Sequence, residues 1–521
     1  MKTSSLRFFA ILNLILFSFN VTTARSSSLA VQEGAALIPK PVSVILGTDY
    51  FELKSNAVIK IADGNPELQK VAQYLADRLN PATGLNVTVL ATGETPASNF
   101  ILLETNASAD QLGKEGYNLV ISTESIRISA NTAEGIFRGI QTLRQLLPPA
   151  IESNEHQEVA WKISTGTIQD YPVYSYRGAM LDVARHFFGI NDVKRYIDLI
   201  AAYKMNYLHL HLADDQGWRI EIKSYPALTE IGSTTQVGGG KGGFYTQDAY
   251  RELVQYAADR YITIVPEIDM PGHTNAALAS IPGLNPDNQP TKLYTGTKVG
   301  FSTLQTKKDF TYQFLNDVFR ELSALTPGPY IHVGGDESHV TKKEDYIPFI
   351  EKVQDIVNAN GKIMIGWDET TQSALRPTSI AQYWARAENA KRGVSKGVKL
   401  LMSPSAKTYL DMKYDAKTTL GLDWAGYIEV DTGYNWDPAT LVPGITKENI
   451  IGIECPLWSE TVTNISEIEF LVFPRLPGYA EIGWSDAARS WDEYKIRLGN
   501  QSERFKFMGI NYYKSAKVPW K

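Results

Sequence analysis

The sequence predicts an α/β protein, a (β/α)8 TIM barrel preceded by a smaller α+β domain. From about residue 175 onward, short apolar runs alternate with segments whose apolar residues recur at helical spacing, which is the pattern of a parallel sheet. About eight such runs fall within roughly 300 residues, which favours a closed barrel over a doubly wound open sheet. No Gly-rich dinucleotide turn follows any early run. We therefore expect the functional residues at the carboxyl ends of the strands.

Residues 1–24 have the features of a signal peptide. Lys2 and Arg7 precede an apolar segment over residues 8–19, and small residues follow at 22–24. The apolar segment is shorter than the ~20 residues that a membrane-spanning helix needs, and no other stretch of the chain approaches that length. We expect export to the periplasm or the medium and no membrane span.

Residues 36–168 are expected to form the smaller α+β domain. Strands are predicted near 118–121 and 125–128, and the apolar spacing over 134–147 predicts a helix. Residues of catalytic type are not concentrated here, so we expect a structural or substrate-flanking role.

The barrel is expected over residues 172–521. Apolar runs bounded by turn residues predict strands near 177–183, 206–212, 262–267, 329–334, 362–367, 380–384, 399–402 and 451–457. Helices are predicted between them, for example over 193–203, 247–260 and 311–325.

Composition narrows the class of partner. The net charge of -6 and a pI near 5.8 argue against nucleic acid or an anionic membrane as the main partner. The 27 tyrosines and 10 tryptophans suit a surface that handles carbohydrate, because sugars stack their apolar faces on aromatic rings.

Two adjacent carboxylates follow the fourth predicted strand. Asp336 and Glu337 come directly after two glycines. Neighbouring side chains in a strand point to opposite faces, but at a turn that Gly334 and Gly335 permit the two carboxylates can converge. Two carboxylates in one cleft do not both ionise easily, so one keeps its proton while the other stays charged. Glycosidic bond cleavage requires this division of labour.

Several motifs near the predicted strands carry a resemblance to a known family. They are Arg177-Gly178, His209-x-His211-x-x-Asp214, Pro266-Glu267-Ile268-Asp269-x-Pro271-Gly272-His273, His332-Val333-Gly334-Gly335-Asp336-Glu337, Gly366-Trp367-x-Glu369 and Trp458-Ser459-Glu460. Together they resemble glycoside hydrolase family 20, the β-N-acetylhexosaminidases, and the segment from Ile38 to Leu147 resembles the α+β domain that such enzymes carry in front. The resemblance implies a retaining, exo-acting enzyme that removes terminal β-linked GlcNAc or GalNAc from glycans, without a metal or organic cofactor.

The resemblance also implies the catalytic roles. In such enzymes the nucleophile is the carbonyl oxygen of the substrate's own 2-acetamido group, which forms an oxazolinium-type intermediate; family 20 is an exception among retaining glycosidases in this respect. Glu337 would protonate the leaving oxygen and then activate water. Asp336 would stay ionised and stabilise the developing positive charge. His273 and Asp214 would form a relay that sets the protonation state of Glu337.

A further set of residues is implied to bind the terminal sugar. Its members are Arg177, Trp367, Trp384, Tyr409, Asp411, Trp458 and Glu460. The tryptophans would enclose the acetamido methyl group and the sugar face, and Tyr409 would hydrogen-bond the acetamido carbonyl oxygen. Arg177 and Glu460 would bind hydroxyl groups at the far end of the sugar, with Asp411 assisting. Arg177 could instead form a buried structural ion pair, and the short polar loop after the seventh strand could place Asp411 outward.

Two other interpretations remain open. His209 and His211 lie two residues apart on one face of a predicted strand, so they could ligate zinc together with Asp269 and His273 in a metal-dependent barrel hydrolase. That interpretation leaves the carboxylate pair and the tryptophans unexplained. The second is a catalytically silent sugar-binding protein on the same fold, against which the intact pair of acidic residues argues.

Overall fold

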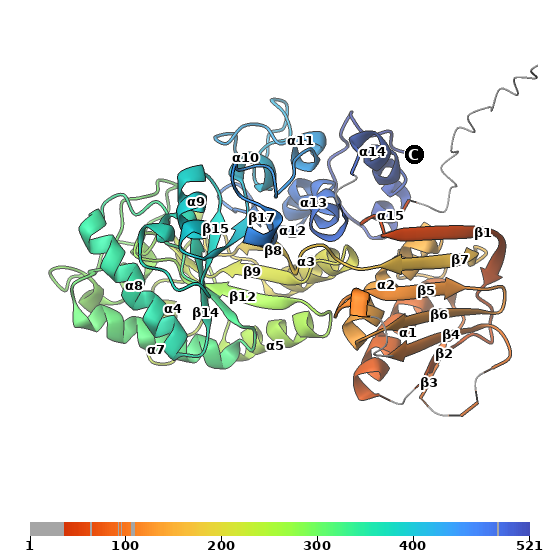
Figure 1. Ribbon diagram of the computed structural model, residues 1–521. Coiled ribbons are helices and arrows are strands. Elements are labelled where there is room, and N and C mark those ends of the chain that lie inside the picture. Colours follow the sequence, from red (N-terminus) through yellow and green to blue (C-terminus); the bar gives the residue numbers. More distant parts are fainter. Residues whose placement is uncertain (1–35, 63–64, 92, 95, 106–109, 487–488) are drawn as a thin grey trace, which may run out of the picture. The chain divides into compact units, whose positions relative to one another are not determined.

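The computed structural model describes residues 36–62, 65–91, 93–94, 96–105, 110–486 and 489–521 (Figure 1). The predicted signal peptide lies outside these described residues. None of the helices that are described combines the length and the apolar character needed to cross a membrane.

A seven-stranded mixed sheet with two helices precedes the barrel (Figure 1). The strands lie in the order β1-β7-β5-β6-β4-β2-β3, with bounds β1 Ser43–Glu52, β2 Val58–Ile61, β3 Thr88–Leu90, β4 Phe100–Thr105, β5 Tyr117–Ile121, β6 Ser125–Ala130 and β7 Lys162–Asp170. Helices α1 (Pro66–Thr83) and α2 (Ala133–Leu146) pack against each other and against the sheet. Asn65 and Thr132 cap them, because each side-chain oxygen accepts a backbone N–H of the first turn.

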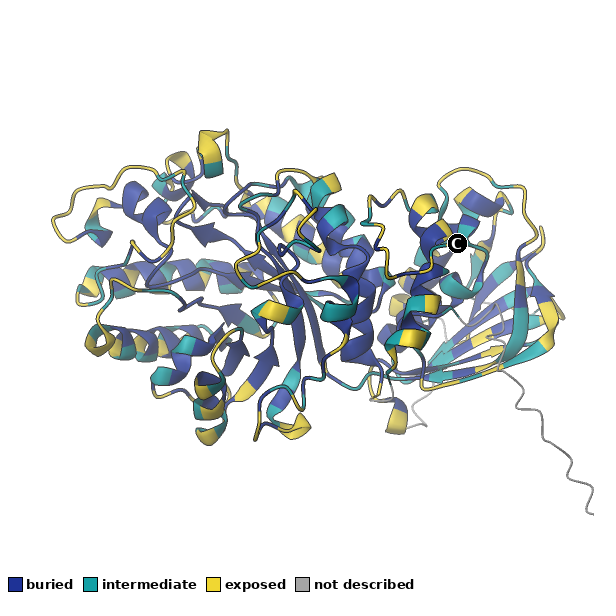
Figure 2. Ribbon diagram, turned by 90° about the horizontal axis from the view of Figure 1, so that it is seen from above, coloured by how far each residue is buried: buried dark blue, intermediate teal, exposed yellow. Residues whose placement is uncertain are grey.

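Eight parallel strands close into a barrel, which confirms the predicted fold class (Figure 1). Their bounds are β8 Tyr176–Asp182, β9 Tyr207–His211, β12 Thr263–Glu267, β13 Tyr330–His332, β14 Ile363–Trp367, β15 Ile380–Tyr383, β16 Lys399–Met402 and β17 Ile450–Leu457. The last strand pairs with the first, with Cys455 opposite Ala179. Figure 2 shows the barrel strands mostly in the colour of buried residues, because side chains fill the interior and helices cover the outside.

Helices lie between the strands of the barrel, and further helices follow its last strand. The longer ones are α3 Ile190–Ala202, α5 Gln247–Ala258, α7 Asp309–Leu325, α8 Lys343–Ala359, α9 Ala387–Ser395, α13 Arg475–Trp484 and α14 Trp491–Gly499. Shorter helices are α4 Ala227–Glu230, α6 Asn275–Ser280, α10 Ser405–Thr408, α11 Val430–Tyr434, α12 Ile465–Val472 and α15 Ser502–Phe507. Helix α7 shows why the pattern is predictive: Phe314, Val318 and Leu322 are four residues apart and form one buried stripe.

Candidate active site

A turn after β13 brings the two carboxyl groups into one cavity. Gly334 and Gly335 have φ angles of 65° and 99°, in the left-handed region that glycine adopts without strain. A Cβ atom on Gly334 would lie 1.7 Å from Oδ1 of Asp269, so a larger residue would clash with that carboxyl group. Glu337 itself has a φ of 44°, an uncommon backbone conformation for a residue with a side chain. Asp336 and Glu337 both line a cavity of about 240 Å³.

His273 lies directly behind both carboxyl groups. Its Nε2 is 3.6 Å from Oε2 of Glu337 and 3.7 Å from Oδ2 of Asp336. Its Nδ1 is 3.3 Å from the carboxylate of Asp214. Burial alone would lower the pKa of His273, but Asp214 and Asp269 raise it well above its usual range, so the ring is protonated at neutral pH. The structure therefore brings Asp214, His273 and Glu337 together.

The two carboxyl groups at the ends of this arrangement differ in protonation. Burial and the neighbouring Asp336 raise the pKa of Glu337, and His273 and Arg185 offset this only in part. Burial would also raise the pKa of Asp214, but Arg185 and His273 hold it well below its usual range. Glu337 therefore keeps a proton to higher pH than a free glutamic acid, as a general acid requires, while Asp214 is charged.

Arg185 supplies a cation to the cavity from the turn after β8. Oδ1 of Asp182, at the end of that strand, accepts the backbone N–H of Ala184 at 2.8 Å and that of Arg185 at 3.0 Å, which fixes the turn. The guanidinium lies 2.8 Å from Oδ2 of Asp214 and 4.7 Å from the ring centroid of Trp458. Sequence reasoning missed Arg185. Its place three residues past the end of the first barrel strand was the available signal.

Arg177 lies at the other end of the same strand, and the structure contradicts its predicted role in binding sugar. It is the second residue of β8, and it is 0% exposed. Its guanidinium pairs with Glu115 and donates to the main-chain oxygens of Lys204 and Tyr174. Barrel active sites lie at the carboxyl ends of the strands, whereas Arg177 stands at the amino end. It is a structural residue with a buried ion pair.

Aromatic side chains form one wall of the cavity. Trp384, Tyr409 and Trp458 line it, as does Trp424. The rings of Tyr409 and Trp424 meet edge to face with their centroids 5.8 Å apart. Trp367 packs behind Trp458, also at 5.8 Å, and is 1% exposed, so it supports the wall from behind. Sequence reasoning missed Trp424, which lies in the long loop between β16 and β17, where no periodic pattern marks it.

Two further carboxyl groups in the cavity have oxygens available to a ligand. Asp411 and Glu460 line the cavity. Among the described residues, both carboxyl oxygens of Asp411 and Oε2 of Glu460 are buried without a hydrogen-bond partner. Burial and the nearby Glu460 raise the pKa of Asp411 well above its usual range. Since buried polar groups are normally hydrogen-bonded, these oxygens are suited to the hydroxyl groups of a bound polar molecule.

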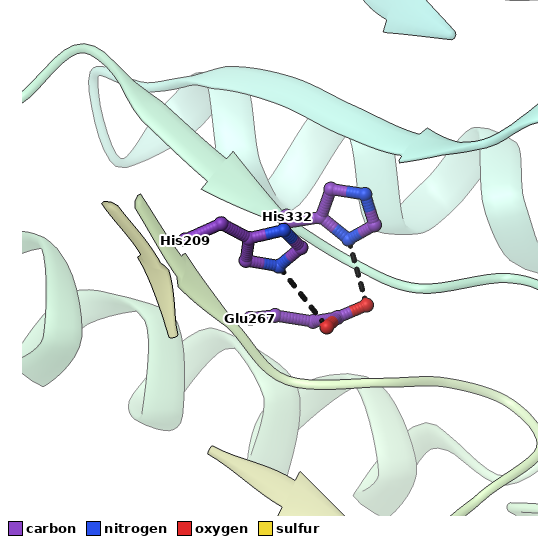
Figure 3. Close-up of side chains that lie close together, drawn as sticks. All are labelled: His209, Glu267 and His332. Carbon is purple, nitrogen blue, oxygen red and sulfur yellow. Dashed lines mark hydrogen bonds and ion pairs between the residues drawn. The ribbon is translucent and has the colours of Figure 1, made fainter. Parts of the chain in front are cut away.

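A network of histidines and carboxylates fills the barrel interior next to the cavity. Figure 3 shows the carboxylate of Glu267, at the end of β12, facing the neighbouring rings of His209 and His332; the two imidazole nitrogens lie 3.1 and 2.8 Å from its oxygens. The same carboxylate accepts the indole N–H of Trp367 at 3.1 Å. Glu267 therefore fixes the ring that supports the aromatic wall of the cavity.

The rings of His209 and His211, considered above as zinc ligands, are already hydrogen-bonded to carboxylates in this network. Both nitrogens of each ring face carboxylates: His209 lies between Glu454 and Glu267, and His211 between Glu267 and Asp214. Burial alone would lower the pKa of either ring, but these carboxylates raise that of His209 to about 9 and that of His211 to about 10. A protonated imidazole has no lone pair to offer a metal. Both rings therefore act as hydrogen-bond donors inside the barrel.

This site places the protein among the glycoside hydrolases. One barrel cavity contains a carboxyl group with a raised pKa, a second carboxyl group beside it and a wall of aromatic side chains. The chain belongs to glycosyl hydrolase family 20. The model of the family's catalytic domain matches residues 174–487, and that of its domain 2 matches residues 35–171. It is therefore an enzyme, a hydrolase of the β-hexosaminidase type.

Known relatives agree over nearly the whole chain. The β-N-acetylhexosaminidase of Cellulomonas fimi is 39% identical over 490 residues, which cover 93% of this chain and 97% of that protein. The structure of the family 20 β-N-acetylhexosaminidase from Streptomyces coelicolor superposes with a TM-score of 0.91 at 47% identity, covering 94% of this chain and 99% of that one. An exo-β-N-acetylglucosaminidase from Vibrio harveyi, solved with N-acetylglucosamine, gives a TM-score of 0.81 at 31% identity, with coverage of 94% and 79%.

Proposed function

We propose that the protein is a retaining exo-β-N-acetylhexosaminidase that hydrolyses terminal, non-reducing, β-linked GlcNAc or GalNAc by substrate-assisted catalysis. One observation carries the proposal: the aromatic wall and the carboxyl pair line the same cavity. An acetamido group can lie against the rings while the bond to be cleaved lies at Glu337. The relative from Vibrio harveyi, which was solved with N-acetylglucosamine, supports the same choice of sugar.

Glu337 is assigned the acid and base steps. Its proton passes to the glycosidic oxygen as the bond to the anomeric carbon breaks, and the raised pKa supports this first role. The carboxylate that results then takes a proton from the water that opens the oxazolinium ring. The protonated His273, 3.6 Å away, stabilises Glu337 between the two steps, and Asp214 holds that imidazole from behind.

Asp336 is assigned to the acetamido N–H. Its Oδ1 is buried and has no hydrogen-bond partner among the described residues, so it is free to accept from the substrate. A carboxylate at this point stabilises the positive charge that develops on the forming ring. Burial and Asp336 raise the pKa of Tyr409 well above its usual value, so its phenol remains a donor for the acetamido carbonyl oxygen.

The size and polarity of the cavity support exo-cleavage. Its volume of about 240 Å³ lies below the ~300–1,000 Å³ of clefts that hold drug-sized ligands, which suits a single sugar unit better than a chain. Arg185, Asp411 and Glu460 place charged or unpartnered polar groups in the same cavity. We assign them to binding the hydroxyl groups at the non-reducing end of the sugar. There they close the cavity, so that a further sugar unit cannot extend beyond that end.

Paired aryl β-glycosides test the proposal. The purified protein is assayed on the N-acetylglucosaminide, the N-acetylgalactosaminide and the plain glucoside, each with and without a chelator. We expect cleavage of the two acetamido sugars only, unaffected by the chelator, and their ratio gives the sugar preference. Equal cleavage of the plain glucoside would mean a protein nucleophile, and loss of activity with chelator would restore the metal interpretation. Binding of the sugars without cleavage would favour a silent sugar-binding protein.

The two arginines of the β8 region are expected to respond differently to substitution. Arg177→Met removes one of the partners of the buried Glu115, and we expect the free energy of unfolding to fall by about 3 kcal/mol with KM unchanged. Arg185→Met removes a cation from the cavity, and we expect kcat/KM on the N-acetylglucosaminide to fall by roughly 10²-fold. Urea unfolding and steady-state kinetics on both variants measure this. If kcat/KM fell further in Arg177→Met than in Arg185→Met, Arg177 would have to be assigned to substrate binding.

We also propose that the enzyme is exported to the periplasm or the medium. The support is the basic and apolar sequence of residues 1–24, which lies outside the described part of the chain. N-terminal sequencing of protein recovered from those fractions tests this; a chain that retains Lys2 and Arg7 contradicts it.

A further inference from the structure

A second hollow, of about 320 Å³, meets the catalytic cavity at Glu337. Glu337 lines both. The two hollows also share a wall, because the indole N–H of Trp384, which lines the catalytic cavity, donates at 3.0 Å to Glu369, which lines the second hollow. We call the second hollow the cationic groove and define it by Glu337, Lys343, Glu369, Gln372, Arg386 and Arg392.

Three cationic side chains line the cationic groove without a carboxylate partner. Within the described residues, Lys343, Arg386 and Arg392 take part in no ion pair that would neutralise them. Arg392 is half-buried and donates from one nitrogen to the Asn389 side chain at 2.8 Å, which leaves its other N–H groups available. Asp368 holds this segment in place, since it accepts the Asn389 amide at 2.6 Å and the backbone N–H of Arg386 at 3.3 Å.

Both carboxyl groups of the cationic groove have raised pKa values, which lowers the negative charge they set against these cations. Burial, together with Asp368 and Asp336, raises the pKa of Glu369 to about 8, so that at neutral pH it is mostly uncharged. Burial and Asp336 also raise the pKa of Glu337. The cationic groove is therefore positive and rich in hydrogen-bond donors under the conditions in which Glu337 acts as an acid.

The position of the cationic groove indicates what occupies it. The general acid delivers its proton to the oxygen that joins the sugar to the leaving group, so the leaving group begins at Glu337. Glu337 lines both the catalytic cavity, which is assigned to the sugar, and the cationic groove, so the cationic groove is the hollow next to the sugar into which the leaving group can extend. Guanidinium groups are suited to planar or tetrahedral oxyanions, which they bind through paired N–H donors.

We propose that the cationic groove receives the leaving group of the substrate and favours leaving groups that carry an anion, a carboxylate or a phosphate. This inference rests on the proposed function. It names the substrate class of the same site: N-acetylhexosamine linked to an acidic sugar or another acidic group.

Matched aryl leaving groups test the inference. The substrates are the 4-carboxyphenyl, 4-phosphonophenyl and neutral 4-carbamoylphenyl β-N-acetylglucosaminides. The double variant Arg386→Gln, Arg392→Gln is compared with the unmodified protein and with Lys391→Gln. Lys391 is an exposed cation on α9, the helix that also carries Arg392. Its side chain does not line the cationic groove, so the Lys391→Gln variant controls for the change in net charge.

We expect the ratio of kcat/KM on the anionic substrates to that on the neutral one to fall roughly tenfold in the double variant and to stay unchanged in Lys391→Gln. Added salt should lower the ratio in the unmodified protein. The comparison of carboxylate with phosphonate identifies the preferred anion. The inference is overturned if the ratio in the double variant stays within about twofold of the unmodified protein, or if kcat/KM falls equally on all substrates. In either case, cleavage of the neutral substrate still supports the proposed function. Failure to cleave any of them overturns both.

Discussion

Glu337→Gln is expected to lower kcat on a β-linked N-acetylhexosamine disaccharide by roughly 10²–10⁴-fold, the range that general acid–base catalysis supplies to one rate-limiting step. The amide keeps the shape of the side chain but cannot donate the proton that a poor leaving group needs. On an aryl glycoside with an acidic phenol, the leaving group departs with little protonation, so the first step is hardly slowed. The reduction in kcat then comes from the second step, in which Glu337 activates water. Steady-state kinetics on both substrates measure the two losses separately.

Rescue by azide and a control variant at a neighbouring acidic residue complete that experiment. Azide needs no base, so it should restore turnover of Glu337→Gln on the aryl substrate and yield the β-glycosyl azide, whose retained configuration identifies the intermediate. Glu344→Gln, an exposed acid in the first turn of α8, should behave like the unmodified protein. Near-normal cleavage of the disaccharide by Glu337→Gln would remove the assignment.

Asp336→Asn is expected to lower kcat/KM on the N-acetylglucosaminide by roughly 10²–10³-fold, the size of effect seen when one preorganised electrostatic partner of a transition state is lost. The loss should be specific to the acetamido group, so the preference for the N-acetylglucosaminide over the plain glucoside should fall by a similar factor. Kinetics on both aryl glycosides measure that preference. An equal loss on both sugars would contradict the role of Asp336.

The pH profile gives the Asp336 variant a second readout. Asp336 raises the pKa of Glu337, so its neutralisation lowers that pKa. Glu337 acts in its protonated form, and the alkaline limb of kcat/KM should therefore move to lower pH in Asp336→Asn. His273 lowers the pKa of Glu337, so His273→Gln should move the same limb to higher pH. Shifts of the same sign in both variants would contradict this electrostatic account.

The sequence predicts the barrel because its physical causes are local. Strands buried on both faces are mainly apolar, and β8 and β17 therefore stand out in the chain even though they carry the buried Arg177, Asp182 and Glu454. Gly334 and Gly335 likewise mark the turn that converges the carboxyl pair, since their left-handed backbone excludes most other residues. These features need no knowledge of distant residues.

The features that the sequence did not predict depend on contacts between distant segments. Arg177 lies at the amino end of β8 and Arg185 in the turn after its carboxyl end, and this difference in position decides the role of each. Thr297 and Val299 line the cavity from the segment between α6 and α7, and nothing in their local sequence signals it. Because barrel active sites lie at the carboxyl ends of the strands, the position of a residue along its strand decides whether it can reach the site. Arg177, at the amino end of β8, cannot.

The buried network around Glu267 limits how this enzyme can change during evolution. Glu267 is 0% exposed, and its carboxylate is hydrogen-bonded to histidines from β9 and β13. A single neutral replacement leaves a buried charge unpaired at a cost of about 3–5 kcal/mol, close to the whole stability of many domains. Residues of this network are therefore expected to covary, whereas Trp424, 57% exposed at the cavity, can change alone. Directed evolution toward other sugars should find its accepted substitutions at such peripheral positions.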